Sequence, residues 1–168
     1  YARENHLPYF GICLGMQIAV IEFARDVLNL KNANSTEFDE QCENPVIDLM
    51  KDQEGVIKGG TMRLGKYPCR VKSGTIMQKA YGAVTIEERH RHRYEFNNNF
   101  RSKMEEAGLI IGGTSPDDSI VETVELPQKD SAISHKFFIG VQFHPEFKSR
   151  PNNAGPLFVE FLKACINY

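Results

Sequence analysis

Residues Leu7–Gly15 have the sequence LPYFGICLG and say more about the fold of this chain than any other segment. Their apolar part, residues 7–12, predicts a short buried strand. Residues 16–30 follow with apolar side chains on one helical face and charged side chains on the opposite face, which predicts an amphipathic helix. Cys13 therefore lies in a tight turn between a strand and a helix. The pattern G-x-C-x-G in such a turn is the cysteine version of a nucleophile elbow.

The predicted turn gives Cys13 the surroundings of a reactive thiol. Gly11 and Gly15 flank it, and a Cβ at either position is expected to crowd the turn or block a substrate. The dipole and the free N–H groups at the helix start favour the thiolate, and the Leu14 N–H can donate to a developing oxyanion. A free cysteine is otherwise commonly a small buried hydrophobe. The strand–turn–helix context favours a nucleophile.

A second buried strand ends in a histidine. Residues 137–143 form a nearly continuous apolar run, which predicts a strand buried on both sides. His144 follows at its carboxyl end, where open α/β sheets gather their active sites. Glu146 lies two residues further on and can orient the imidazole. A thiol nucleophile needs a base, and the base needs an orienting group, so Cys13, His144 and Glu146 form a candidate triad.

The rest of the chain alternates short strands with helices. Further strands are predicted near residues 45–50, 69–71, 109–112 and 120–126, and helical segments at 75–81, 98–107 and from Gly155-Pro156 onward. Buried strands need helices on both faces of their sheet, so the fold class is an α/β sandwich. The 168 residues are enough for one domain with a core of its own.

Composition limits the class of function. The net charge is −2, so no overall positive field attracts nucleic acid or an anionic membrane. No apolar run approaches the roughly 20 residues that span a bilayer. The four cysteines, Cys13, Cys42, Cys69 and Cys165, show neither a disulfide pattern nor metal-ligand spacing. We therefore expect a cytoplasmic protein without a metal site.

The run Arg89-His90-Arg91-His92-Arg93 allows three interpretations. As a nucleic-acid patch it is short, flanked by acidic residues and without interleaved aromatic residues. As a metal site it offers His90 and His92 on one strand face but no third ligand. The third interpretation is a solvated charged strand.

Several blocks together resemble a known family. GICLGMQ at Gly11–Gln17 and QFHPEF at Gln142–Phe147 are similar to the class I glutamine amidotransferases, whose triad is Cys-His-Glu. Four further blocks narrow the resemblance to the amidotransferase domain of the CTP synthases. These are NANSTEF at Asn32–Phe38, GGTMRLG at Gly59–Gly65, ERHRHRYE at Glu88–Glu95 and HPEFKSRP at His144–Pro151.

The resemblance implies a fold and a set of site residues. The fold is an open, mostly parallel, flavodoxin-like sheet with helices on both faces. Cys13 is the nucleophile, His144 the base and Glu146 its orienting partner. Glu37 binds the α-ammonium of glutamine, and Arg93 or the backbone around it binds the α-carboxylate. The remaining implied glutamine contacts are Leu14, Gly15, Met16 and Gln17, mainly through backbone groups and the Gln17 side chain.

The resemblance also implies a larger enzyme. Its glutaminase half releases ammonia, which a synthetase domain of the same polypeptide uses to convert UTP to CTP with ATP and Mg²⁺, in pyrimidine biosynthesis. GTP activates the glutaminase half, and the whole enzyme forms a homotetramer. The domain itself needs no cofactor. Compared with this pattern, residues 1–168 lack the synthetase domain, the first strands of the amidotransferase domain and a glycine segment that supplies a second oxyanion donor. The paired glycines of residues 59–65 suit a mobile flap near the entrance.

Three alternatives stay open from the sequence. The chain could serve another ammonia-using synthetase, such as one for GMP or carbamoyl phosphate. It could be a non-catalytic interaction module that retains the fold, although such a module needs no nucleophile–base pair. It could also be a stand-alone cysteine hydrolase with no ammonia acceptor.

Overall fold

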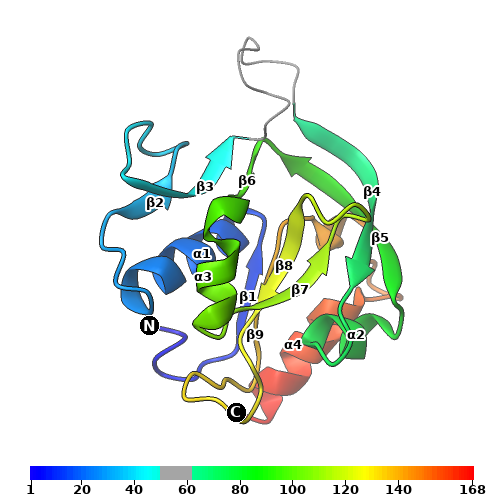
Figure 1. Ribbon diagram of the computed structural model, residues 1–168. Helices are drawn as coiled ribbons and strands as arrows, with labels where there is room; N and C mark the ends of the chain where they lie inside the picture. The colour runs from blue at the N-terminus through cyan, green and yellow to red at the C-terminus, as the bar shows by residue number, and fades with distance from the viewer. Residues whose placement is uncertain (50–61) are drawn as a thin grey trace.

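The computed structural model describes residues 1–49 and 62–168, which form two sheets and four α-helices (Figure 1). The six-stranded sheet has, in spatial order, β1 (Tyr9–Ile12), β9 (Phe138–Val141), β8 (Val121–Glu125), β7 (Ile110–Thr114), β4 (Arg63–Val71) and β5 (Thr85–His92). The three-stranded sheet has β2 (Ala33–Ser35), β3 (Asn44–Leu49) and β6 (Tyr94–Phe96). The helices are α1 (Leu14–Asp26), α2 (Ile76–Tyr81), α3 (Arg101–Glu106) and α4 (Pro156–Ile166), with 3₁₀ turns η2 (Asn98–Phe100) and η3 (Pro145–Phe147).

The large sheet is mixed. Strands β1 and β9 pair in parallel, which is the arrangement that the resemblance implies. The other four neighbouring pairs, β9–β8, β8–β7, β7–β4 and β4–β5, are antiparallel. Strands β7 and β8 follow each other through a short turn, and such a connection can only join antiparallel neighbours. Parallel pairing in this sheet is therefore confined to the two strands that carry the candidate triad.

Two apolar cores cover the two faces of the large sheet, which confirms the α/β fold class. One core contains α1, with Met16, Val20 and Phe23 packed around Phe138. The other contains α2 and α4 and receives Ile139 and Val141 from the same strand β9. Alternate side chains of β9 therefore enter opposite cores, as expected for a strand buried on both sides. Figure 1 shows α1 and α3 on one side of the sheet and α2 with α4 on the other.

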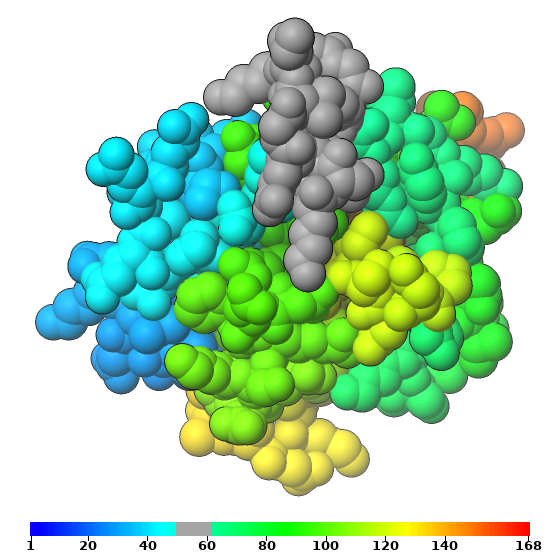
Figure 2. Space-filling view, turned by 45° about the horizontal axis from the view of Figure 1, so that its top comes forward, coloured from blue at the N-terminus to red at the C-terminus, as the bar shows by residue number. Residues whose placement is uncertain are grey.

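Most predicted elements are present, with shifted ends. Helix α1 ends at Asp26 rather than at residue 30. The predicted helix over 98–107 is η2 followed by α3, and Gly108 ends it with φ +100°. In the space-filling view, the β2–β3 region in cyan lies on the opposite side of α3 from β4 in blue-green (Figure 2). Of the expected flap over residues 59–65, residues 59–61 lie outside the described residues, and residues 63–65 begin strand β4.

Candidate active site

Cys13 lies in a strained turn between β1 and α1. Its φ of 51° and ψ of −104° place it in a region that side chains other than glycine rarely adopt. The Cys13 N–H donates to the Val141 carbonyl at 2.7 Å, so the turn is tied to strand β9. A Cβ on Gly11 would lie 2.6 Å from the Gly15 carbonyl carbon, which explains the glycine there. The turn therefore has the geometry of a nucleophile elbow.

His144 and Glu146 form a bonded pair after β9. Nδ1 of His144 and Oε1 of Glu146 are 2.5 Å apart. The backbone N–H of His144 donates to the Arg89 carbonyl at 2.8 Å. Its imidazole ring stacks on Phe147, with ring centroids 4.8 Å apart. The carboxylate can only accept, so His144 carries its proton on Nδ1 and leaves Nε2 as the basic nitrogen. Among the described residues, the buried His144 Nε2 has no hydrogen-bond partner.

The parallel pairing of β1 and β9 brings the candidate nucleophile Cys13 and the candidate base His144 to one edge of the sheet. Ile12 is paired with Val141. Just beyond this pair the two strands end, and the polypeptide continues to Cys13 after β1 and towards His144 after β9. Strand β5 passes beside both of them. Its Arg89 carbonyl accepts from the His144 N–H, and its Arg91 carbonyl lies 4.0 Å from the Cys13 Sγ. Cys13 and His144 thus lie beyond the carboxyl ends of two neighbouring parallel strands, and their catalytic roles stay predictions.

The surroundings of the Cys13 thiol act in opposite directions on its ionisation. Burial raises its pKa, and hydrogen bonds from the Leu14 backbone and the Gln142 side chain lower it. The carboxylates of Glu146 and Glu37 raise the pKa further. The helix start, which is the part visible in the sequence, favours the thiolate. In the structure desolvation is the larger effect, so the thiol needs a base to ionise it.

The glutamine contacts implied next to Cys13 differ in what they can offer. Leu14 is half exposed, with its N–H directed at the sulfur. A Cβ on Gly15 would meet only the Tyr9 hydroxyl, at 3.7 Å, so this side of the turn is open. The Met16 side chain is fully buried and packs against Gly140, which leaves only its backbone for a ligand.

The Gln17 side chain is buried, and its amide is hydrogen-bonded to neighbouring residues of the site. Its Nε2 donates to the Tyr94 carbonyl at 3.0 Å and to the Gln142 Oε1 at 3.3 Å. Nε2 of Gln142 in turn donates to the Cys13 Sγ at 3.6 Å. Gln142 has no role in the sequence-based prediction, although a polar side chain inside an otherwise apolar strand was a usable signal.

Glu37 and Arg93 carry the two charges expected for an amino-acid head group. Glu37 is exposed in the loop after β2, where its N–H donates to the Ser35 Oγ at 3.2 Å, and its carboxylate influences the Cys13 pKa. Arg93 lies between β5 and β6, and its buried Nε has no hydrogen-bond partner in residues 1–49 and 62–168. These positions are compatible with the implied roles, which stay predictions.

The inward face of β5 forms a buried polar row. Nδ1 of His90 lies 3.1 Å from Nε2 of His92, and Nδ1 of His92 lies 3.1 Å from the Tyr94 carbonyl. On the other side, Nε2 of His90 lies 3.6 Å from Oε2 of Glu122, whose Oε1 accepts from Arg63 Nη1 at 2.6 Å. Burial lowers the pKa of His90 to about 2 and that of His92 to about 4, so both rings are neutral. Arg89 and Arg91 alternate with them and are exposed.

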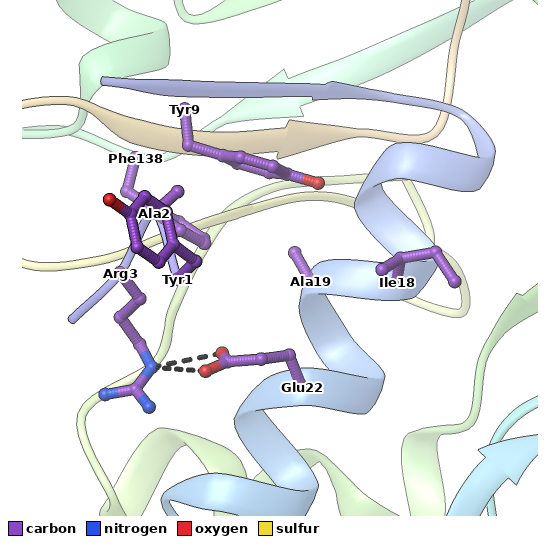
Figure 3. Close-up of a pocket in the computed structure, with 8 residues that line it drawn as sticks. All are labelled: Tyr1, Ala2, Arg3, Tyr9, Ile18, Ala19, Glu22 and Phe138. Carbon is purple, nitrogen blue, oxygen red and sulfur yellow. Dashed lines mark hydrogen bonds and ion pairs between the residues drawn. The ribbon is translucent and has the colours of Figure 1, made fainter. Parts of the chain in front are cut away.

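Two cavities lie elsewhere on the described surface. One, of about 150 Å³, lies between the first residues and α1 and is lined by Tyr9 and Phe138 among others (Figure 3). Its two charges, Arg3 and Glu22, already bond each other at 2.8 and 3.0 Å. The other, of about 360 Å³, is lined by residues of β4, β7 and α3. No group of three or more His, Cys, Asp or Glu suited to a metal, and no helix able to span a membrane, occurs among the described residues.

Comparison with known proteins identifies the family. Residues 1–164 match the profile of the family described as "Glutamine amidotransferase class-I", and the chain belongs to this family. Two similar curated proteins carry the name CTP synthase. That of Rubrobacter xylanophilus is 60% identical over 166 residues, covering 99% of this chain, and that of Staphylococcus aureus is 54% identical over 169 residues, covering 100%. The chain spans only 29% and 30% of their respective lengths.

Solved structures agree with this family. The glutaminase domain of Trypanosoma brucei CTPS, with bound acivicin, superposes with a TM-score of 0.90 at 38% identity, covering 99% of this chain and 62% of that one. A putative GMP synthase component from Thermoplasma acidophilum gives a TM-score of 0.57 at 18% identity, covering 100% of this chain and 62% of that one. The second likeness concerns the fold alone.

Proposed function

We propose that this chain hydrolyses glutamine at Cys13 and supplies the ammonia for ATP-dependent amination of UTP to CTP. The observation that carries the glutaminase part is the bonded pair His144–Glu146 beside Cys13. Its basic nitrogen, His144 Nε2, is buried and has no partner among the described residues. The parallel pairing of β1 and β9 brings His144 to the same edge of the sheet as a thiol held in a strained elbow. The CTP part is supported by the 60% and 54% identity to CTP synthases.

The proposed reaction proceeds through a thioester. His144 Nε2 takes the proton of the Cys13 thiol, and the sulfur attacks the side-chain amide carbon of glutamine. The carbonyl π electrons move to oxygen, where the Leu14 N–H is placed to donate. The intermediate collapses as His144 returns the proton to the leaving nitrogen, which departs as ammonia. Water, deprotonated by His144, then attacks the thioester, and the C–S bond breaks to give glutamate and the free thiol.

We infer that the glutamine head group lies between Glu37 and Arg93. A zwitterion needs one anionic and one cationic partner. The buried guanidinium nitrogen of Arg93, which has no partner among the described residues, is suited to a carboxylate. ATP, Mg²⁺, UTP and the activator GTP belong in this proposal to the whole of a larger enzyme, and most of the residues that bind them are expected outside residues 1–168. That enzyme is expected to be a cytoplasmic homotetramer, with residues 1–168 as its amidotransferase domain.

Acivicin provides the first test, because it is the compound bound in the T. brucei relative. The full-length protein is exposed to acivicin with and without excess glutamine and analysed by peptide mass spectrometry, with Cys13→Ala as the control. We expect one adduct, on Cys13, that forms more slowly with glutamine present. Labelling of Cys42, Cys69 or Cys165 instead would contradict the assignment.

The acceptor is tested separately. CTP formation from UTP, ATP and Mg²⁺ is measured with glutamine or with ammonium chloride as the nitrogen source. Cys13→Ala is expected to abolish the glutamine reaction and to retain the ammonia reaction. Glutamine hydrolysis without CTP formation from either source would leave the triad assignment intact and exclude UTP as the acceptor.

A further inference from the structure

Gln142 is a buried amide directly beside the nucleophile. It follows β9, two residues before His144, and its side chain is fully buried. A buried primary amide lowers the stability of the folded protein unless its N–H donors and its carbonyl acceptor form hydrogen bonds. Its two polar atoms have one partner each on the described chain, namely Gln17 for Oε1 and Cys13 for Nε2.

The orientation of the amide follows from a backbone carbonyl. The Tyr94 carbonyl can only accept, so the Gln17 atom 3.0 Å away must be Nε2. The second hydrogen of this nitrogen points at Gln142, so the Gln142 atom 3.3 Å away must be its acceptor, Oε1. The remaining atom, Nε2 of Gln142, then faces the sulfur of Cys13 at 3.6 Å as a donor. A flipped Gln142 amide would place two donors against each other.

The Tyr94 carbonyl has a second hydrogen-bond partner, His92. Nδ1 of His92 lies 3.1 Å from it and must be the donor. His92 is neutral, since burial lowers its pKa to about 4, and its Nε2 is therefore free to accept from Nδ1 of His90. Two donors thus converge on one carbonyl, which fixes its position and with it the direction of the whole chain of hydrogen bonds.

We propose that the Gln142 side-chain amide is a catalytic group that stabilises the thiolate of Cys13, in an orientation set by Gln17 and the Tyr94 carbonyl. This inference rests on the proposed role of Cys13 as nucleophile. A hydrogen bond from N–H to a thiolate is charge-assisted and stronger than one to a neutral thiol. The donor therefore acts twice. It favours proton transfer from the thiol to His144, and it stabilises the electron pair that returns to sulfur when the thioester C–S bond breaks.

Substitution of Gln142 is expected to shift the ionisation of Cys13. In the full-length protein, the rate at which iodoacetamide alkylates Cys13 is followed against pH by peptide mass spectrometry. Removal of a charge-assisted hydrogen bond is expected to raise the pKa of this thiol by about one unit or more, so Gln142→Met lowers the rate at pH 7 about tenfold. Gln142→Glu, which places a carboxylate near the sulfur, is expected to raise the pKa further. The exposed Cys165 in the same sample is the internal control and keeps its profile.

The pH profile of Cys13 alkylation distinguishes an effect of Gln142 on thiol ionisation from an effect on packing around the sulfur. A purely structural role for Gln142 would change access to the sulfur and hence the plateau rate at high pH, and the midpoint would stay within about 0.3 unit of the unsubstituted protein. That result would overturn the inference. If both Gln142 variants fail to fold, Gln17→Met decides, because it removes the donor that orients the amide. An upward shift of the midpoint supports the proposal, and an unchanged midpoint overturns it. Absence of acivicin labelling on Cys13 in the unsubstituted protein would instead overturn the proposed function.

Discussion

One methyl group added at Gly140 is expected to separate the nucleophile from its base without altering either residue. Gly140 lies on β9 directly under α1, and a Cβ there would be 2.9 Å from both Cα and Cβ of Met16. Ordinary contact begins at 3.4 Å, so α1 and β9 must move apart by about 0.5 Å. Cys13 precedes α1 and His144 follows β9, so this movement changes the distance between the two reactive groups.

The expected cost of Gly140→Ala has a stability part and a catalytic part. Overpacking of this kind lowers the free energy of unfolding by about 1–3 kcal/mol. A displacement of about 1 Å can reduce catalysis about 100-fold, so half of that displacement is expected to reduce kcat/KM for glutamine roughly tenfold. Urea unfolding measures the first part. Glutamate release, corrected for the folded fraction, measures the second.

Gly112→Ala is the matched control. Its Cβ would be 2.6 Å from Glu125 Oε1 and 2.7 Å from Thr123 Oγ1, so a similar loss of stability is expected. Gly112 is on β7, which does not contact the elbow strand in the sheet order, and kcat/KM is expected to stay within about twofold. Equal losses of activity in the two variants, or full activity in Gly140→Ala, would show that the distance between α1 and β9 does not control the reaction.

Three further predictions concern the elbow, the head group and the buried histidines. Cys13→Gly is expected to unfold with a free energy about 1 kcal/mol higher than Cys13→Ala in urea, because glycine adopts a φ of 51° without strain. Arg93→Met is expected to raise KM for glutamine about tenfold or more, with ammonia-dependent CTP formation unchanged, since a charged hydrogen bond contributes about 1.5–3 kcal/mol. The third concerns pH. The folded pKa values of His90 and His92 are about 2 and 4, so the unfolded chain takes up protons below pH 6.5 that the folded chain excludes, and stability is lost as pH falls. Glu122 and Glu125, whose burial raises both pKa values to about 7, act in the opposite direction above about pH 4.5, so the loss is expected mainly below about pH 4.5, measured by urea unfolding.

Each of these has a contradicting result. Equal stabilities of the glycine and alanine variants would show that the turn is unstrained. An unchanged KM with a lowered kcat in Arg93→Met would remove Arg93 from head-group binding. Nitrogen-15 NMR of labelled histidine checks the third directly, since a protonated His90 or His92 ring at about pH 5.5 in the folded protein would exclude neutral rings.

The parts of the fold that follow from local pattern were predictable. The run Leu7–Ile12 and the periodicity after Cys13 indicate a strand and a helix because their signals repeat within a few residues. The position of the candidate site follows from β1 and β9, because a histidine after a buried strand lies at the same sheet edge as an elbow on its parallel neighbour. The antiparallel part of the sheet was not predictable in this way, because its register depends on pairs such as Arg63 with His92 that are far apart in the chain.

The electrostatics of the site also needed the structure. The helix start and the burial of Cys13 act in opposite directions on its pKa, and their balance depends on depth, which cannot be read from sequence. Arg63 and Glu122 look like ordinary surface charges in the sequence, yet their carboxylate–guanidinium bond is buried. The role of Gln142 was not predicted, because the apolar residues on both sides of it make this segment look like an ordinary buried strand in the sequence.

The buried row on β5 has a consequence for the evolution of the family. Two hydrogen bonds link His90, His92 and the Tyr94 carbonyl, and each of them needs one proton. The two neutral imidazoles supply both protons, and His90 Nε2, 3.6 Å from Glu122 Oε2, has no hydrogen-bond partner among the described residues. A substitution at any one position reverses or interrupts the direction of donation at the others. Homologues are therefore expected to retain or exchange these side chains as a group, as a linked set of positions rather than as independent ones.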